Sequence, residues 1–410
     1  MTKLPISTRR EFLTRGFGLI GVGATIPQFL VQTALAGPTA APGQNILVVL
    51  QLSGGNDGLS TVVPYADDNY HRARRITRIT TEDVLKIDRH TGLHPNLDGF
   101  LDLLDDGQLS IIQGVGYPNP NRSHFQSMDI WHAANLVNPR RAQGWLGRYA
   151  ERTFADAIDP ELGIAVGSDQ APLALQGANY GGLSLQRPET FRFFGENQVG
   201  ENYGKLMGLD QMNMADELGY ITRTTVAANA ASEKIRQIAA RYRSSVAYPR
   251  SALATSLQTV AGLIAGGLST RVYYVFQGGY DTHAGQRQRH DRLMRDLGDA
   301  VLAFQKDLAA QGNSERVLTM GFSEFGRRVQ ENGSQGTDHG AAGPMFLVGP
   351  GVKAGLNGPR PNLSGRALDR GDIRFSIDFR SVYATVLENW LGAPSAPILG
   401  EQFPLVECLG

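Results

Sequence analysis

Two short segments combine aspartate and histidine with glycine, a composition that suits metal binding. Asp338 and His339 lie within the run Gly336–Gly340. Asp281 and His283 form a second such pair on a glycine-rich segment. Carboxylate oxygens and imidazole nitrogens are ligands of divalent cations, and small neighbours let backbone and ligand come close together. The two segments therefore predict a site for a metal ion or a charged substrate. The alternative for the second pair is a capping aspartate beside a surface histidine.

A third polar segment places an arginine, a serine and a histidine in succession. Arg122, Ser123 and His124 precede an expected helix that runs to about residue 136, and Ser123 suits its N-cap position. A helix N-terminus stabilises negative charge, and a guanidinium group matches the geometry of phosphate or sulfate. Ser123 could therefore hold or attack an oxyanion. The alternative is that Ser123 only caps the helix.

Asp57 lies just beyond the apolar run Asn45–Leu52. This short run of branched residues is typical of a strand that is buried on both faces. In open α/β sheets, ligands bind beyond the carboxyl ends of the strands. Asp57 is therefore a candidate ligand-binding residue. A plain Asn-Asp-Gly turn explains the same residues equally well.

Four apolar runs are interpreted as buried strands, and each ends in a polar loop. They begin near residues 45, 108, 271 and 316, and helical patterns separate them. This alternation predicts an α/β fold with a largely parallel central sheet and helices on both faces. The loops after the strands would then meet at one edge of the sheet. They carry Asp57, Ser123, Asp281, His283, Glu324, Asp338 and His339.

The middle of the chain gives weaker patterns. We interpret residues 144–248 as an insertion or cap on the core, partly because Gly177–Gly200 is rich in glycine, glutamine and asparagine. Short strands are considered at Ile164–Val166 and Leu173–Leu175. Residues 37–410 then form a single α/β domain that includes this insertion.

The N-terminus has the pattern of an export signal. Thr8–Leu13 contains two consecutive arginines, the apolar stretch Gly16–Leu30 follows, and Ala34–Ala36 offers a small-x-small cleavage site. We interpret residues 1–36 as a cleaved twin-arginine signal peptide. The alternative is an ordinary N-terminal helix or membrane anchor, but a spanning helix needs about 20 apolar residues. We therefore expect export to the periplasm by the twin-arginine machinery, with no membrane span after cleavage.

The composition argues against a nucleic-acid or membrane-surface partner and against an intrachain disulfide. The 410 residues carry 39 basic and 39 acidic side chains, which gives no indication of a nucleic-acid partner or an anionic membrane surface. The single cysteine, Cys408, cannot form an intrachain disulfide.

Together these segments resemble the bacterial exported family known as domain of unknown function 1501. The resemblance rests on the twin-arginine leader and on Leu52–Ser60, Asn121–Phe125, Gly279–His283, Ser323–Arg328, Gly336–Gly340 and Asp378–Gly392. That family is similar to the alkaline-phosphatase-like superfamily, which includes phosphatases and sulfatases. The fold that this resemblance implies agrees with the α/β pattern above.

The resemblance also implies an activity, the hydrolysis of small anionic phosphate or sulfate esters with a divalent metal such as zinc, calcium or magnesium. The nucleophile would be Ser123 or a metal-activated group. The implied catalytic residues are Ser123, Arg122 and His124, and the implied metal ligands are Asp57, Asp281, His283, Asp338 and His339.

Two features depart from the superfamily pattern. No histidine follows His339, whereas the phosphatases carry a further histidine near the C-terminus. The spacing from Asp281 to His283 is also tighter than the usual Asp-x-x-x-His. These differences favour a second hypothesis, a catalytically inactive or altered binding or assembly protein of the cell envelope. A third hypothesis, a serine hydrolase of carboxyl esters, has less support because Ser123 lacks the Gly-x-Ser-x-Gly elbow.

Overall fold

The computed structural model describes residues 44–410 except 156–158, 189–231 and 233. The expected signal peptide, residues 1–36, and residues 189–231 of the expected insertion lie outside the described ranges. Within those ranges, no helix combines the length and the apolar character that crossing a membrane requires.

A nine-stranded sheet forms the centre of the described chain. Its order is β13-β5-β12-β9-β1-β8-β6-β7, with β14 beside β5. Only β12 runs against the others, since it pairs antiparallel with both β5 and β9. The prediction of a largely parallel α/β sheet is therefore confirmed. The strands are β1 (Ile46–Ser53), β5 (Leu109–Gly116), β6 (Gly163–Val166), β7 (Leu183–Leu185), β8 (Val272–Gly278), β9 (Val317–Phe322), β12 (Gly343–Val348), β13 (Gly355–Asn357) and β14 (Ile377–Asp378).

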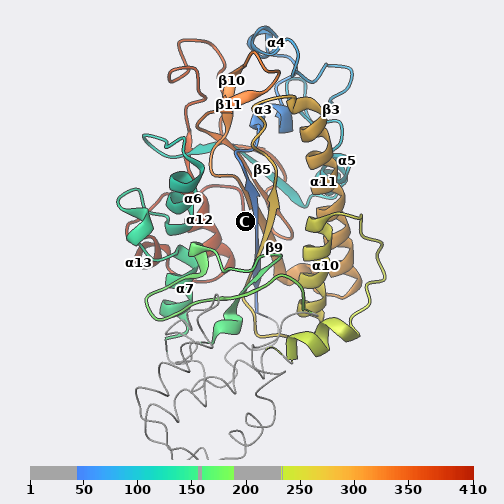
Figure 1. Ribbon diagram of the computed structural model, residues 1–410, viewed down its shortest axis with the longest axis vertical. Helices are drawn as coiled ribbons and strands as arrows, with labels where there is room; N and C mark the ends of the chain where they lie inside the picture. The colour runs from blue at the N-terminus through green and yellow to red at the C-terminus, as the bar shows by residue number, and fades with distance from the viewer. Residues whose placement is uncertain (1–43, 156–158, 189–231, 233) are drawn as a thin grey trace, which may run out of the picture.

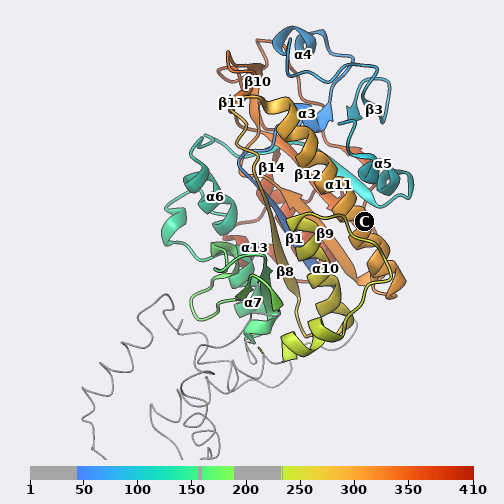
Figure 2. The same ribbon diagram turned by 45° about the vertical axis from the view of Figure 1, so that its right-hand side comes forward.

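Helices cover both faces of this sheet (Figure 1 and Figure 2). One face carries α5 (Asp98–Asp105), α10 (Ala252–Ala265) and α11 (Gln286–Ala310). The other carries α6 (His124–Ala133), α7 (Trp145–Thr153), α12 (Phe379–Thr385), a π-helical turn (Val386–Trp390) and α13 (Ser395–Leu399).

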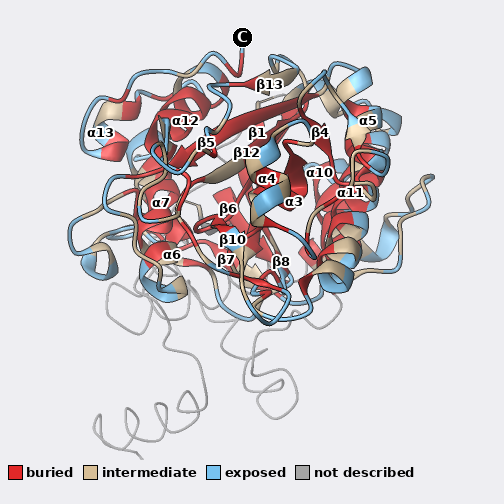
Figure 3. Cartoon of the chain, turned by 90° about the horizontal axis from the view of Figure 1, so that it is seen from above, coloured by how far each residue is buried: buried red, intermediate tan, exposed pale blue. Residues whose placement is uncertain are grey.

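The central strand β1 is buried on both sides. Val48 and Leu50 belong to the apolar core beneath α10 and α11, while Leu47 and Val49 belong to the core on the opposite face. Seen from above, the buried strands lie between the two layers of helices (Figure 3). Burial on both faces explains why the sequence of β1 is a continuous apolar run rather than an alternating one.

Smaller elements gather at the end of the sheet where the parallel strands finish, at the top of Figure 1. The strands β10 (Arg327–Glu331) and β11 (Thr337–His339) form a hairpin. A second small sheet contains β2 (Val62–Val63), β4 (Gly92–Leu93) and β3 (Leu85–Lys86). Two short helices, α3 (Gly58–Thr61) and α4 (Asp68–Ala73), connect to these strands. Single 3-10 turns lie at Pro139–Arg141, Pro160–Leu162, Leu173–Leu175 and Ser314–Arg316.

The sequence predicts an insertion over residues 144–248, but the described part of that segment contributes to the core. The strands β6 and β7 extend the central sheet beyond β8. The helix α7 buries Trp145 and Tyr149 in the core on one face of the sheet. Leu173–Leu175 forms a 3-10 turn and not a strand. Strands of three or four residues are too short to show a clear hydrophobic period.

Asp57, at the start of α3, is fully buried and forms an ion pair with Arg74, which is also fully buried. Arg74 donates to both carboxylate oxygens, with 2.8 Å between Nη2 and Oδ1. Ser60 and Gln286 donate to Oδ2. Burial alone would raise the pKa of Asp57, but the charge and hydrogen bonds of Arg74 hold that pKa well below its usual range. Asp57 is therefore ionised and fully bonded inside the protein.

Arg74 also fixes the hairpin. Its guanidinium group donates to the backbone oxygens of Arg328 (2.9 Å) and Val329 (3.0 Å), which lie in β10. The pair of Arg74 with Asp57 therefore joins the loop after β1 to the hairpin that ends in His339.

The helices α5 and α11 approach each other closely at a glycine. A Cβ atom at Gly99 would lie 2.4 Å from the backbone oxygen of Gly298, whereas a Cβ atom at Gly298 would lie 3.4 Å from its nearest neighbour, an ordinary contact. We expect Gly99→Ala to lower the free energy of unfolding by about 1–3 kcal/mol, the usual cost of overpacking. Gly298→Ala is the matched control and should be neutral or stabilising by up to about 1 kcal/mol. Urea denaturation measures both, and an equal loss in the two variants would contradict this helix contact.

Arg74→Met would leave the Asp57 carboxylate buried without its cation. We expect this variant to lose about 3–5 kcal/mol of unfolding free energy at neutral pH, as when one partner of a buried pair is removed. The control is Arg140→Met, because the Arg140–Asp129 pair is exposed and should contribute less than about 1 kcal/mol.

The same pair predicts a pH dependence. The folded pKa of Asp57 lies below its unfolded value, so its stabilisation is complete at neutral pH and is lost as the pH falls below about 4. The difference between Arg74→Met and the unchanged protein should therefore narrow in acid. Thermal denaturation between pH 3 and pH 7 checks this, and a difference that grows in acid would contradict it.

Candidate metal centre

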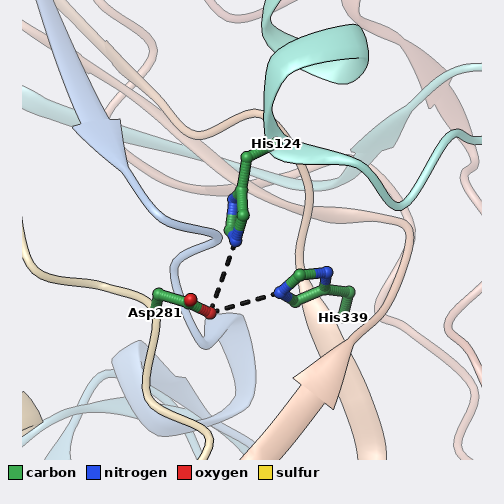
Figure 4. A group of neighbouring side chains, drawn as sticks. All are labelled: His124, Asp281 and His339. Carbon is green, nitrogen blue, oxygen red and sulfur yellow. Dashed lines mark hydrogen bonds and ion pairs between the residues drawn. The ribbon is translucent and has the colours of Figure 1, made fainter.

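Three imidazole rings converge on one carboxylate oxygen. The distances to Asp281 Oδ1 are 3.0 Å from His283 Nε2, 3.2 Å from His339 Nε2 and 3.4 Å from His124 Nε2. Figure 4 shows His124 and His339 pointing toward Asp281 from different segments. Asp281 and His283 follow β8, His339 ends β11, and His124 begins α6 after β5. The predicted convergence of loops beyond the parallel strands therefore brings these four side chains together.

The other ring nitrogen of each histidine is held by an acceptor. The Nδ1 partners are Glu324 Oε1 for His124 (2.8 Å), Asp338 Oδ1 for His283 (3.1 Å) and the backbone oxygen of Arg122 for His339 (2.7 Å). These partners only accept hydrogen bonds, so each can hold a proton on Nδ1. In that tautomer each Nε2 atom is an unprotonated nitrogen that faces Asp281, as in a metal ligand.

In this arrangement the lone pairs of the Nε2 atoms lie close together. Nε2 of His283 and Nε2 of His339 are only 2.9 Å apart, and two unprotonated nitrogens cannot form a hydrogen bond with each other. A cation between them, or an additional proton, would remove the repulsion. Metal-ligating histidines almost always have the second ring nitrogen bonded to a carboxylate or a backbone carbonyl, as here.

His124 provides an independent test of whether a cation fits. Its Nε2 atom is buried and has no hydrogen-bond partner among the described residues. Together with oxygen from Asp281 and nitrogen from His339, it forms a group whose ligand atoms all lie within 4.8 Å of one another. The side chains of Asp281 and His283 are about half exposed, which leaves the group open to solvent.

Neighbouring charges and burial set the protonation of the group. The hydrogen bond with Glu324 raises the pKa of His124, whereas burial lowers the pKa of His339. For Asp281, burial raises the pKa, but the hydrogen bond and the positive charge of Arg327 lower it well below its usual range. At neutral pH, Asp281 is therefore ionised and His339 is neutral, as metal binding requires.

Arg327 is buried and links the loops that carry these residues. Its Nη2 atom lies 2.7 Å from Asp281 Oδ1. The same guanidinium group donates to the backbone oxygens of Gly54, Gly55, Tyr280 and Thr337. It thereby joins the loops after β1 and β8 to the strand β11. The sequence analysis does not identify this role, although Arg327 follows a predicted strand in a polar run.

Asp57 supports the histidine cluster indirectly, through the hydrogen bonds of Gln286. The side-chain amide of Gln286 donates to Asp57, while its oxygen accepts from Thr337 Oγ1 (2.6 Å) and Thr282 Oγ1 (3.1 Å). Thr282 and Thr337 directly precede His283 and Asp338 in the chain. Asp57 was a candidate ligand from its position after β1, but the structure places it in the ion pair with Arg74. Its role there is to hold the ligand-bearing segments.

Ser123 and Arg122 lie beside the group in different ways. Ser123 is exposed at the N-cap of α6, yet its side chain makes no capping hydrogen bond. The Arg122 side chain pairs with the buried carboxylate of Asp372, and its backbone oxygen holds His339. Arg328 pairs with the same carboxylate at 3.3 Å. Two guanidinium groups thus share one buried carboxylate next to the cluster.

Solved structures with a similar fold include a sulfatase from Pseudoalteromonas sp., with 10% identity and a TM-score of 0.37 over 89% of this chain and 70% of that chain. The phosphonate monoester hydrolase of Agrobacterium radiobacter has 8% identity and a TM-score of 0.37 over 88% and 78% of the two chains. The C-terminal periplasmic domain of EcEptC from Escherichia coli, in complex with zinc, has 11% identity and a TM-score of 0.35 over 77% and 75%. At these sequence identities and TM-scores, the similarity gives no information about the reaction.

Sequence comparison identifies the family. The chain has no significant match among curated proteins. A family model described as "Protein of unknown function (DUF1501)" matches residues 44–390. This match covers most of the chain, including every candidate ligand discussed above. The protein therefore belongs to the DUF1501 family.

Proposed function

We propose that the protein is a metal-dependent hydrolase of phosphate or sulfate esters that is exported by the twin-arginine route. The observation that supports it is the convergence of the Nε2 atoms of His124, His283 and His339 on Asp281. Three imidazole nitrogens with one carboxylate oxygen suit zinc, whereas calcium and magnesium prefer oxygen ligands. Asp338, a predicted ligand, would act as the partner that orients His283.

When bound, a divalent cation would act as a Lewis acid toward the ester and lower the pKa of water at the site. The side chains of the protein would prepare the site for it. Glu324 and Asp338 would keep the Nδ1 protons of His124 and His283 in place. Arg327 would keep Asp281 ionised and correctly oriented.

The surroundings of the cluster favour an anionic substrate. Arg122 and Arg328 share the single carboxylate of Asp372, and the N-terminus of α6 lies at the cluster through His124. Guanidinium groups and helix N-termini both stabilise phosphate and sulfate oxygens. A small ester anion could therefore bind between the cation and this positive region.

One observation favours a second candidate function, cation binding without turnover. The carboxylate of Asp57 is fully bonded to Arg74, Ser60 and Gln286, so the described residues complete one cation site and not the two-metal clamp of many phosphoryl-transfer enzymes. The protein would then be an envelope binding or assembly protein. Measured metal content and turnover distinguish the two functions.

The first prediction for this site concerns metal and turnover together. We expect elemental analysis of the exported protein to find about one divalent cation per chain, in keeping with the single ligand set. Hydrolysis of 4-nitrophenyl phosphate or 4-nitrophenyl sulfate should stop with a chelator and return with zinc. His283→Ala and His339→Ala should weaken metal binding by at least about 100-fold, more than the 10–100-fold that is typical for outer-shell changes.

His90→Ala is the control, because His90 lies outside the cluster and contacts Arg89. It should leave both metal content and turnover unchanged. A folded protein without bound metal, or turnover that survives His339→Ala, would overturn the hydrolase proposal. Stoichiometric metal with no turnover of either ester would instead support the binding function.

The second prediction concerns the nucleophile. The Ser123 hydroxyl has no hydrogen bond to a described residue that could take its proton, and a nucleophilic serine needs such a base or a metal. Because no described side chain holds the Ser123 hydroxyl and a bound metal would activate water directly, we expect water to be the nucleophile, and Ser123→Ala to keep the metal and to retain turnover within about tenfold. A loss of about a thousandfold or more with the metal retained, a size typical of removing a catalytic nucleophile, would instead identify Ser123 as the attacking group.

A further inference from the structure

A basic groove lies on α4 and the segment that follows it. The groove has a volume of about 640 Å³ and is lined by Asp68, His71, Arg72, Arg75 and Arg78. The complete chain has equal numbers of basic and acidic side chains, so three arginines against one aspartate are a local excess of positive charge. The groove is separate from the histidine cluster described above.

The three arginines are free to bind an anion. None of them takes part in an ion pair within the described ranges of the chain, and Arg72 donates only to the uncharged Asn69 Oδ1, at 2.8 Å. Arg72 and Arg75 are exposed, and Arg78 is half-buried. Glu331, an acidic residue that contacts this segment, already accepts hydrogen bonds from its backbone N–H groups.

The segment is fixed in position relative to the cluster. The Glu331 carboxylate accepts hydrogen bonds from the backbone of Arg75 (2.9 Å) and Thr77 (2.8 Å). At its far end, Arg287 donates to the backbone oxygen of Arg78 at 2.6 Å. Both anchors belong to elements next to the cluster, since β10 begins at Arg327, which contacts Asp281, and α11 follows the loop that carries Asp281 and His283.

The strand β10 connects the two sites. Its first residue, Arg327, contacts Asp281, and its last residue, Glu331, holds the groove segment. Figure 1 and Figure 2 both show α4 beside β10 and β11 at the same end of the molecule.

We propose that this groove binds a second anionic ester group of a polymeric substrate whose first ester lies at the Asp281 cluster. The inference rests on the proposed function and extends it from a small ester to a chain with repeated phosphate or sulfate groups. Guanidinium groups bind such anions through two parallel hydrogen bonds. The groove shares no residue with the cluster, so one small monoester does not contact both sites, whereas a chain with repeated ester groups can.

An anionic membrane is a different partner for the same charges. Ile76, which is 57% exposed between Arg75 and Arg78, could enter a lipid surface. Ile76 is, however, the only large apolar side chain exposed on this segment among the described residues, which is little for insertion into a lipid surface. We therefore assign the groove to the polymer.

The test compares Arg72→Gln/Arg75→Gln/Arg78→Gln with a matched triple variant, Arg241→Gln/Arg250→Gln/Arg366→Gln, which removes three exposed arginines elsewhere. The probes are fluorescent polyphosphate and dextran sulfate, and fluorescence anisotropy at several salt concentrations measures their binding to the exported protein. We expect the groove variant to bind the preferred polymer at least about tenfold more weakly. For this variant, the slope of log affinity against log salt concentration should become shallower by about 2 to 3, as expected for three lost phosphate contacts. The control variant should match the unchanged protein.

Turnover separates this inference from the proposed function. The groove variant should hydrolyse 4-nitrophenyl esters within about twofold of the unchanged protein while its KM for the polymer rises at least about tenfold, because only the second ester contact is lost. Polymer binding that depends on the groove in a protein without turnover would support the groove and overturn the hydrolase function. Equal polymer binding by all three proteins, or arginine-dependent binding to phosphatidylglycerol vesicles in place of the polymers, would overturn the groove assignment.

Discussion

The buried guanidinium group of Arg327 is the constraint on which the geometry of the site depends. It contacts Asp281 and four backbone oxygens that belong to three different segments of the chain. A buried cation that lost these acceptors would be costly, since an uncompensated buried charge strongly destabilises a protein. The loops after β1 and β8 and the strand β11 are therefore held together before any ligand binds. Preorganisation of this kind is what a metal site needs from its protein.

A buried ion pair supports this arrangement. The ion pair of Arg74 with Asp57 joins the loop after β1 to the hairpin. Gln286 bonds to Asp57 and also to Thr282 and Thr337, which precede His283 and Asp338 in the chain. Asp57 thus occupies the position expected of a ligand but stabilises the site through its partners. This difference explains why a single group of possible metal ligands is found among the described residues. Any metal chemistry at the proposed site would therefore involve a single cation.

The parts of this architecture that follow from local patterns could be predicted from the sequence. The strands near Val48, Tyr274 and Met320 are continuous apolar runs, and parallel strands bring the loops at their carboxyl ends to one edge. That reasoning places Asp281, His283 and His339 together. It does not identify His124 as their neighbour in preference to Ser123, because which side chain turns inward depends on the first turn of α6. Nor does it reveal the partner of Asp57, since Arg74 is distant from it in sequence and pairs with it only in the folded chain. The short strand at Ile164–Val166 is confirmed as β6, but the sequence does not place β6 or β7 in the central sheet, because short strands carry little periodic signal.

The central claim is that three histidines and one aspartate of this chain bind a single cation. X-ray absorption spectroscopy of the zinc-loaded, exported protein tests it most directly, because the method reports the atoms bonded to the metal. We expect a shell of nitrogen and oxygen at about 2.0–2.1 Å with the multiple-scattering signature of about three imidazole rings. His124→Ala should remove one of those rings while the protein remains folded. A spectrum without imidazole, or one that His124→Ala does not change, would contradict the claim.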